Sequence, residues 1–365
     1  MADKLDIFLV CAPGLEPFLA AEADELGFKP ALAVRGGVEV QGTWQDVWRA
    51  NLWLRGATRV LVRMGSFKAL NLNQLGSEAQ RFPWVDTLLP REPVRVDVTC
   101  RKSRIAHSGA ATQRLERALR SAAIPVTPKA QVGLKIRIEN DLCTISVDTS
   151  GEPLHKRGFK AAVSKAPMRE TMASLLLRAC AYRPGETIID PMCGSGTFPI
   201  EAAEIASGLA PGRARGFAFE RLASFNSASW AQLRTPVTRK DNCASQGFDR
   251  DDGAVRAAVQ NAKRAGVKCD FKRRPVAELE PIPGPPGLVI CNPPYGERIG
   301  NKKPLFALYG TLGERLREPG FEGWRVGIVT SDASLAKSTG LPFEPSGPPI
   351  AHGGLKVWLF KTGPL

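Results

Sequence analysis

The sequence predicts an α/β protein in which a doubly wound, mostly parallel sheet follows an α+β amino-terminal half. Short apolar strands alternate with amphipathic helices in the second half of the chain, which is the pattern of a parallel sheet covered by helices. Strand-like and helix-like segments also alternate near the amino terminus, in a β-α-β-α-β order. The 365 residues, 43% of them hydrophobic, are enough for two or three domains with buried cores.

The first expected module covers residues 1–62. Helices are predicted at 15–26, where Gly27 supplies the left-handed end, and at 44–53. The strands of this module are predicted at 7–11, 37–41 and 59–63.

The second expected module covers residues 63–158. A strand at 94–99 and a helix at 110–121 precede a hairpin of strands 133–139 and 143–148, with Asn140-Asp141 as its tight turn.

The third expected module covers residues 159–365. Helices are predicted at 170–181 and at 252–265, the latter with Val255, Ala258, Val259 and Ala262 as its apolar stripe. Ligands of such sheets bind at the carboxyl ends of the strands, so the site is expected there. The strands of this module are predicted at 186–190, 246–249, 288–291, 325–330 and 355–360.

Charge and composition narrow the function. The net charge is +14, and Arg91 to Lys165 hold 15 Lys/Arg against 7 Asp/Glu, which is a net +8. Such a surplus favours a nucleic-acid partner over a merely solvated basic face. No apolar run reaches the roughly 18 residues of a membrane span, and the start does not read as a signal peptide. Eight single cysteines without a Cys-x-x-Cys pair predict neither a metal site nor disulfides, and the expected form is a cytoplasmic monomer.

A glycine turn follows the buried strand that ends at Asp190. Gly194 and Gly196 allow a sharp bend and a close approach of a ligand. The turn is neither a dinucleotide fingerprint, because residue 199 is proline, nor a phosphate loop, because no Gly-Lys-Ser/Thr follows. Asp249 ends the next strand, where a carboxylate can accept from ribose hydroxyls. Together these residues favour a nucleoside that carries an amine over an ordinary strand-to-helix turn.

The most specific motif is Asn292-Pro293-Pro294-Tyr295, at the end of an apolar strand. The prolines remove two backbone donors, so the Asn292 amide oxygen and the Pro293 carbonyl can both accept from one amino group. Tyr295 supplies a flat face against which a flipped base can stack. The pattern predicts methylation of an exocyclic amine.

These residues resemble the class I, Rossmann-like S-adenosylmethionine methyltransferases with an Asn-Pro-Pro-Tyr motif. The segments 190–197 (DPMCGSGT) and 292–298 (NPPYGER) are most similar to the RNA guanine-N2 methyltransferases with a THUMP domain, of the RlmL type for 23S rRNA and the TrmN type for tRNA. Further similar segments run through nearly the whole chain, namely 51–55, 148–151, 154–158, 166–170 and 353–355.

The resemblance implies a ferredoxin-like module, a THUMP module and a catalytic domain, in this order. It implies that the cofactor is S-adenosylmethionine, that Asp249 holds its ribose and that Asn292 to Tyr295 hold the target base. The residues that it assigns to the methionine part and its surroundings are Asp190, Cys193, Gly194, Gly196, Thr197 and Asn292. Two positions depart from the family: Pro275 stands where an acid usually contacts the adenine, and Thr171 replaces a common asparagine.

The phosphate contacts are expected in the most basic stretch, at Arg101, Lys102, Arg104, Lys156 and Arg157. Methylation of N2 of guanine in 23S rRNA is the preferred interpretation. The alternatives are a tRNA substrate, adenine N6 in RNA or DNA, a protein glutamine, and a non-catalytic RNA-binding assembly factor.

Overall fold

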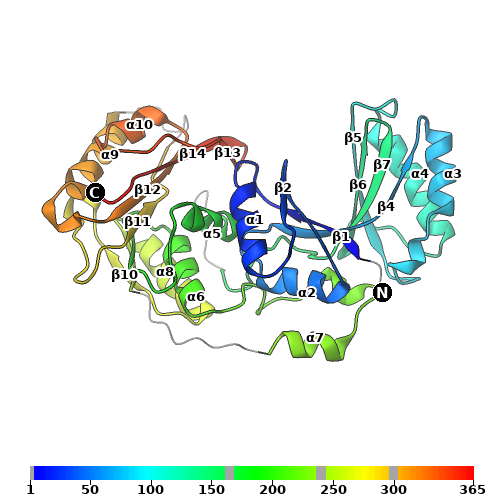
Figure 1. Cartoon of the computed structure of the whole chain (residues 1–365), viewed down its shortest axis with the longest axis horizontal. Coiled ribbons are helices and arrows are strands. Elements are labelled where there is room, and N and C mark those ends of the chain that lie inside the picture. Colours follow the sequence, from blue (N-terminus) through cyan, green and yellow to red (C-terminus); the bar gives the residue numbers. More distant parts are fainter. Residues whose placement is uncertain (1–3, 161–167, 236–243, 296–302) are drawn as a thin grey trace. The chain divides into compact units, whose positions relative to one another are not determined.

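The structure is a computed structural model that describes residues 4–160, 168–235, 244–295 and 303–365. The chain forms two compact units, each built around a seven-stranded sheet (Figure 1). The first unit comprises Met1–Val10, Ala20–Leu154 and Arg215–Thr235, and the second comprises Cys11–Leu19, His155–Ala214 and Pro236–Leu365.

The sheet of the first unit has the strand order β2-β3-β1-β4-β7-β6-β5. Its pairings are antiparallel except for β5 and β6, which run parallel. The strands are β1 (Leu5–Val10), β2 (Leu32–Val34), β3 (Gly37–Gly42), β4 (Arg59–Lys68), β5 (Val94–Arg101), β6 (Val132–Glu139) and β7 (Leu142–Asp148). The helices are α1 (Glu16–Glu25), whose first residues belong to the second unit, α2 (Trp44–Trp53), α3 (Leu72–Arg81), α4 (Ser108–Ser121) and α7 (Ser227–Leu233).

Strand β4 joins the two modules expected in the amino-terminal half. It pairs with β1 through residues 59–63 and with β7 through residues 61–68, with a bulge between Arg63 and Gly65. The expected boundary at residues 62 and 63 lies inside this strand. In the first half of β4 the buried Val60 and Val62 alternate with half-buried residues, whereas no residue after Val62 is buried. The apolar alternation of the sequence therefore predicted a strand that ended at Arg63.

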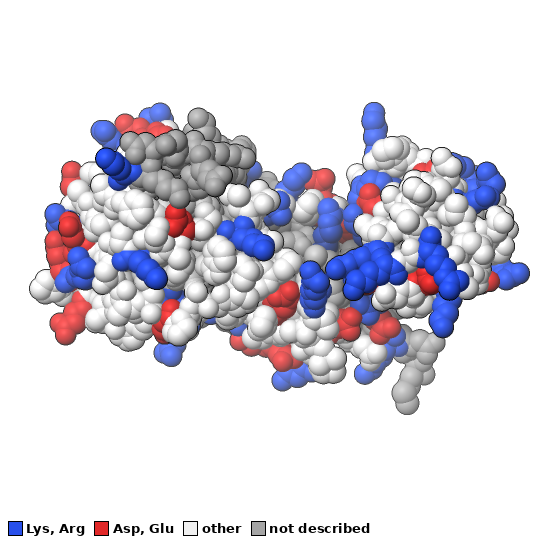
Figure 2. All heavy atoms as spheres, turned by 90° about the horizontal axis from the view of Figure 1, so that it is seen from above, with Lys and Arg blue, Asp and Glu red and all other residues white. Residues whose placement is uncertain are grey.

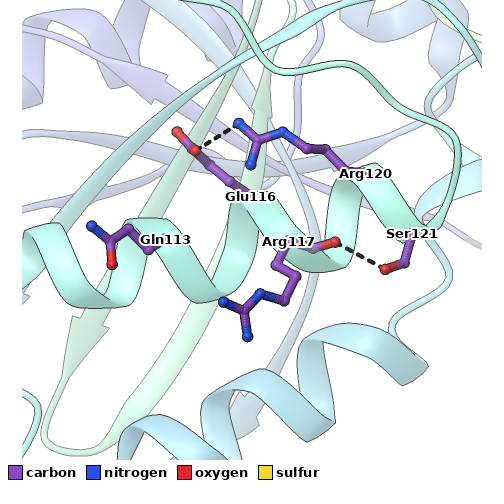
Figure 3. A pocket seen from close by; sticks show the side chains of 5 residues that line it. All are labelled: Gln113, Glu116, Arg117, Arg120 and Ser121. Atoms are coloured by element: carbon purple, nitrogen blue, oxygen red, sulfur yellow. Dashed lines mark hydrogen bonds and ion pairs between the residues drawn. The ribbon is translucent and has the colours of Figure 1, made fainter.

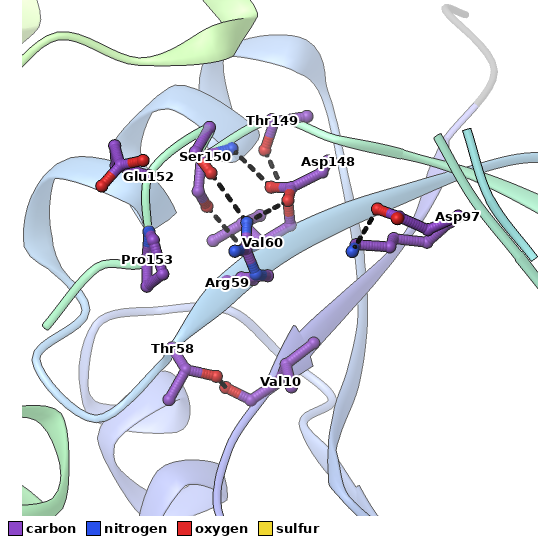
Figure 4. Close-up of polar contacts among 12 residues, drawn as sticks. Val10, Thr58, Arg59, Val60, Asp97, Asp148, Thr149, Ser150, Glu152 and Pro153 are labelled. Atoms are coloured by element: carbon purple, nitrogen blue, oxygen red, sulfur yellow. Dashed lines mark hydrogen bonds and ion pairs between the residues drawn. The ribbon is translucent and has the colours of Figure 1, made fainter. Parts of the chain in front are cut away.

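The turn after β7 is fixed against β4 by buried polar contacts (Figure 4). Asp148 is fully buried and pairs with the guanidinium of Arg59. The backbone N–H of Thr149 donates to the Val60 carbonyl at 3.0 Å, and the Val60 N–H donates to the Ser150 hydroxyl at 2.9 Å. These bonds satisfy the polar groups of a buried loop, as burial requires.

Residues 215–235 belong to the first unit, although they lie within the sequence range of the third expected module. The Phe219 ring stacks on Trp48 of α2 with centroids 5.9 Å apart and meets Trp230 of α7 edge-on at 4.9 Å. The Phe219 N–H donates to the Thr149 carbonyl at 3.0 Å. Aromatic rings in an irregular segment follow no helix or strand period, so periodicity could not reveal this excursion.

Local rules predicted several of these elements. Asn140 and Asp141 have φ values of 50° and 62°, which confirms the two-residue hairpin turn. Helix α2 has the predicted bounds and begins with a capping box between Thr43 and Asp46. Helix α3 was missed, because it is mostly polar, contains Gly76 and buries little along its length.

The sheet of the second unit has the strand order β10-β9-β8-β11-β12-β14-β13. The five strands from β10 to β12 are parallel, and β14 and β13 are antiparallel, which confirms the predicted doubly wound, mostly parallel sheet. The strands are β8 (Ile188–Asp190), β9 (Ser245–Asp249), β10 (Asp270–Arg273), β11 (Leu288–Cys291), β12 (Arg325–Thr330), β13 (Ile350–His352) and β14 (Leu355–Lys361). The helices are α5 (Glu170–Ala179), α6 (Thr197–Ala206), α8 (Asp252–Ala265), α9 (Lys303–Leu316) and α10 (Ala333–Lys337).

Two apolar clusters attach helices to this sheet. Ile189 and Val289 pack with α9 and α10 in one cluster, whereas Phe271 packs with α6 and α8 in the other. In α8 the residues Ala258 and Ala262 are buried as predicted. Val259 is 47% exposed, so its predicted place in the apolar stripe is wrong: the buried face of α8 runs through Ala258, Asn261, Ala262 and Ala265 and leaves Val259 outside it.

The strand order places the expected site residues together. The chain passes from β8 outward to β9 and β10, and then returns to β11 on the other side of β8. The crevice at such a reversal lies at the carboxyl ends of the two central strands. Val289 pairs with Ile189, so β8 ending at Asp190 and β11 ending at Cys291 finish at the same edge.

Candidate active site

The glycine turn connects β8 to α6 and has the conformation that its glycines allow. Gly194 has φ 53° and Gly196 has φ 83°, both in the left-handed region. A Cβ on Gly196 would lie 2.8 Å from the Phe271 ring and 3.0 Å from Cβ of Ala258, so the turn lies directly against β10 and α8. The turn therefore needs glycine at residue 196 for its backbone angle and for its packing.

Two carboxylates lie beside this turn, at the ends of β8 and β9. One oxygen of Asp249 accepts from the Gly194 N–H and the other from the Asp251 N–H, both at 3.0 Å. Asp190 is 2% exposed and accepts from the Met192 N–H at 3.1 Å. Each carboxylate oxygen can accept a second hydrogen bond, so both acids can still bind a ligand that donates.

Burial and, after it, the charge of Asp249 raise the pKa of Asp190 well above its ordinary value. A cation placed beside both acids would reverse this effect, because it favours their charged forms. The pair is thus suited to a ligand with a positively charged group.

Cys193 and Thr197 present less to a ligand than the resemblance implies. The Cys193 side chain lies in the apolar cluster with Phe271, and the Thr197 hydroxyl accepts from the Lys160 ammonium at 3.0 Å. Both side chains are turned to the protein interior, at 6% and 8% exposure.

Asn292 follows β11 directly. Its amide oxygen is buried and has no hydrogen-bond partner in the part of the chain that the structure describes. Leaving a buried acceptor unpaired costs about 1–3 kcal/mol. An acceptor in this state at the carboxyl edge of the sheet is suited to an amino group supplied by a ligand.

The prolines and Tyr295 complete the motif. The Tyr309 hydroxyl of α9 donates to the Pro294 carbonyl at 3.5 Å, and the preceding Pro293 is buried. Tyr295 is half-buried against the α9 cluster, and burial raises its pKa to about 12, so it stays a neutral phenol. The role of the Asn292 and Pro293 oxygens as the acceptors for the target amine stays a prediction. Residues 296–298 of the similar segment and 166–167 of another lie outside the described residues.

The expected RNA contacts at the end of β5 are exposed. Arg101, Lys102 and Arg104 all lie on the surface, and the nearest carboxylates to the two arginines are Glu139 at 3.9 Å and Asp141 at 3.7 Å. Such long, exposed ion pairs hold a side chain weakly. The three side chains are exposed, and their contact with phosphates stays a prediction.

The predicted phosphate contact of Arg157 is wrong. Its side chain is 1% exposed and lies 3.4 Å from the carboxylate of Glu201, which is itself 1% exposed. A guanidinium in this position cannot reach a phosphate and instead neutralises a buried acid of α6. The neighbouring Lys156 is exposed, and its phosphate contact stays a prediction. Burial, followed by the charges of Arg169, Arg157, Lys156 and Lys160, lowers the pKa of His155 to about 4, so this histidine adds no charge at neutral pH.

The first unit has two further surface features, a band of basic side chains and a polar hollow on α4. Lys and Arg side chains form a band over the strands and helices of its β5–β7 part (Figure 2). The outer face of α4 has a hollow of about 460 Å³, in which Glu116 pairs with Arg120 at 2.9 Å and the Ser121 hydroxyl donates to the Arg117 carbonyl (Figure 3). Every residue that lines the hollow is polar, so it resembles no cofactor pocket; these residues are Gln113, Glu116, Arg117, Arg120 and Ser121.

No described helix is both long enough and apolar enough to cross a membrane. Across residues 4–160, 168–235, 244–295 and 303–365, no group of three or more His, Cys, Asp or Glu side chains could hold a metal ion.

Two family models match the chain. The model described as RMKL-like, methyltransferase domain, matches residues 157–341, just over half of the chain. The model of the RlmL ferredoxin-like domain matches residues 6–61.

Individual proteins agree with these matches. The ribosomal RNA large subunit methyltransferase K/L of Syntrophotalea carbinolica is 34% identical over 93% of this chain and 51% of its own length, so the chain spans about half of that relative. A Synechocystis protein described as a candidate RNA methyltransferase is 31% identical over 97% of this chain and 95% of its own length. The solved structure of SMU.472, a candidate methyltransferase complexed with S-adenosylhomocysteine, is 27% identical, has a TM-score of 0.87 and covers 100% of this chain and 99% of its own.

These matches confirm the predicted methyltransferase and ferredoxin-like domains and the predicted Rossmann-like α/β class. They cover both the glycine turn and the Asn292 motif. The chain belongs to the RMKL-like family of methyltransferases.

Proposed function

We propose that the protein transfers a methyl group from S-adenosylmethionine to N2 of a guanine in 23S rRNA. The observation that carries this proposal is the buried amide oxygen of Asn292, which has no hydrogen-bond partner among the described residues and lies at the reversal point of the sheet, one residue before Pro293. The name of the Syntrophotalea relative, a large-subunit rRNA methyltransferase, supports the choice of RNA.

The cofactor is proposed to lie between the two carboxylates and the glycine turn. Asp190 would accept from the amino group of its methionine part, and Asp249 from its ribose. S-adenosylmethionine supplies an electrophilic methyl on a positively charged sulfur, and this charge suits Asp190, whose pKa is raised by burial and by the charge of Asp249.

The protein's part in the reaction is orientation. The lone pair of a base amine is delocalised into the ring, so the nitrogen attacks only when it is held in line and allowed to become pyramidal. The Asn292 amide oxygen and the Pro293 carbonyl can each accept a hydrogen bond from one N–H of this amine, while the target base stacks against the Tyr295 ring. When bound, S-adenosylmethionine would supply the methyl group; its transfer from sulfur to the nitrogen would leave S-adenosylhomocysteine, and the amine would release one proton to water.

RNA is proposed to bind through basic side chains of the first unit and through Lys156, which belongs to the second unit. Residues 63–158 are proposed to form a THUMP module, and the protein is proposed to act in the cytoplasm. Methyl transfer to RNA, read as N2-methylguanosine by mass spectrometry of nucleosides, tests the proposal. A methylated adenine would contradict the guanine assignment.

The proposed RNA surface predicts a change in salt dependence. Replacement of Arg101, Lys102, Arg104 and Lys156 by alanine should weaken binding across RNA sequences and flatten the plot of log K against log salt by about one unit per lost contact. The measurement is a binding titration at several salt concentrations.

A matched control removes the same number of exposed charges from the second unit. For this variant Lys272, Arg273, Arg317 and Lys337 become alanine, and the slope is expected to stay near the wild-type value. Equal slopes for the wild type and the first variant would show that the RNA binds elsewhere.

A further inference from the structure

Asn261 of α8 contacts the glycine turn from inside the protein. It is 1% exposed, and its Nδ2 donates to the Ser195 carbonyl at 3.1 Å. Ser195 is the residue between the two glycines of the turn. Asn261 lies three residues after Ala258, so a polar side chain stands on the apolar face of the helix. A buried amide in this position needs polar partners, and the Ser195 carbonyl of the turn is one of them.

Arg264 sets the orientation of this amide. Its Nη2 donates to the Asn261 Oδ1 at 2.7 Å, and its Nε donates to the Phe159 carbonyl at 2.8 Å. A guanidinium can only donate, and a carbonyl can only accept. The amide oxygen must therefore face Arg264, and the amide nitrogen must face Ser195.

The Ser195–Gly196 peptide is consequently held at both ends. Its carbonyl accepts from Asn261, and its N–H donates to the Cys193 carbonyl at 2.8 Å. The Gly194 N–H is held in turn by Asp249, and the Cys193 N–H by the Phe248 carbonyl at 2.8 Å. Of these hydrogen bonds, the one from Asn261 to the Ser195 carbonyl connects the turn to α8.

We infer that Asn261, oriented by Arg264, is a positioning residue that pre-forms the glycine turn for the cofactor. The inference rests on the proposed cofactor and names a residue that touches neither the cofactor nor the target base. A turn that is already ordered loses less freedom on binding, so its ligand binds more tightly.

The test compares the binding of S-adenosylhomocysteine by calorimetry. Asn261→Leu removes the donor at similar volume, and we expect Kd to rise about tenfold, which corresponds to about 1.4 kcal/mol. The KM for S-adenosylmethionine should rise with it, while kcat at saturation changes by less than about twofold, because the Asn292 site is untouched. A general loss of folded protein would lower kcat instead and would leave Kd of the folded fraction unchanged.

A second variant covers the case in which the leucine variant does not fold. Asn261→Asp keeps the shape and the Arg264 contact but places an acceptor against the Ser195 carbonyl, so it should show the same rise in Kd. Asn51→Leu is the matched control: Asn51 is also 1% exposed and donates to Val47 and Thr149, but it lies in the first unit. It should bind S-adenosylhomocysteine as the wild type does.

The possible results separate this inference from the proposed function. Wild-type protein that releases no heat with S-adenosylhomocysteine would overturn the cofactor assignment together with the inference. Wild-type binding with unchanged Kd in the folded Asn261 variants would overturn the inference alone.

Discussion

Asn292→Ala is expected to lower kcat by roughly 10²–10³-fold, the typical effect of removing one positioned polar group from a reacting centre. The amide oxygen of Asn292 is buried and unpaired among the described residues, so it is already in place for a group that only the substrate brings. Single-turnover methylation of RNA at saturating S-adenosylmethionine measures this loss.

The same variant should keep its affinity for S-adenosylhomocysteine within about threefold, because Asp190, Asp249 and the glycine turn are unchanged. Tyr309→Phe, which removes the 3.5 Å bond to the Pro294 carbonyl and leaves the Pro293 carbonyl in place, is the matched control and should lose far less activity. Wild-type turnover in Asn292→Ala would show that another group orients the nucleophile.

Arg157→Ala is expected to lower the free energy of unfolding by roughly 3–5 kcal/mol, the usual cost of leaving one partner of a buried ion pair uncompensated. Both side chains of the Arg157–Glu201 pair are 1% exposed, so water cannot replace the lost guanidinium. Denaturant unfolding followed by tryptophan fluorescence measures the change.

Lys156→Ala is the control from the adjacent position. Its side chain is exposed, and substitutions of this kind usually change stability by no more than about 0.5 kcal/mol. If Arg157→Ala kept full stability but flattened the salt dependence of RNA binding, the phosphate contact expected from the sequence would be right and its assignment as a buried structural cation would be wrong.

Asn292 and Arg157 show what the sequence could and could not reveal about the site. The main site residues lie at the ends of strands whose apolar pattern is clear; they are Asp190, the glycine turn, Asp249 and Asn292. The carboxyl ends of neighbouring parallel strands meet at one edge of the sheet. Their proximity therefore follows from the order of the elements. The chemistry of each residue type could then be added without knowledge of any distance.

The burial of Arg157 could not be predicted in this way. A basic residue in a basic stretch has the composition of an RNA contact, and the linear sequence does not say which way its side chain points. Glu201, a charge among the apolar and small residues of α6, is the signal that could have warned of a buried partner. Asn261 gave a similar signal on the apolar face of α8, three residues after Ala258.

The fold was predictable where local chemistry decides it and not where distant segments meet. The Asn140-Asp141 turn and the start of α2 depend on neighbouring residues, and both were predicted. The continuation of β4 through residue 68 depends on β7, which supplies its partners from about 80 residues along the chain. The packing of 215–235 in the first unit likewise depends on Trp48.

The most direct test of the proposed methyl transfer is nucleoside mass spectrometry of RNA methylated by the purified protein. Total RNA from cells that lack the gene is incubated with the wild-type protein or Asn292→Ala and with methyl-labelled S-adenosylmethionine, and the large rRNA and the tRNA are then digested separately. The prediction is labelled N2-methylguanosine in the large rRNA, formed by the wild type and reduced roughly 10²–10³-fold in rate with the variant. Label found only as N6-methyladenosine, or equal labelling by both proteins, would contradict it.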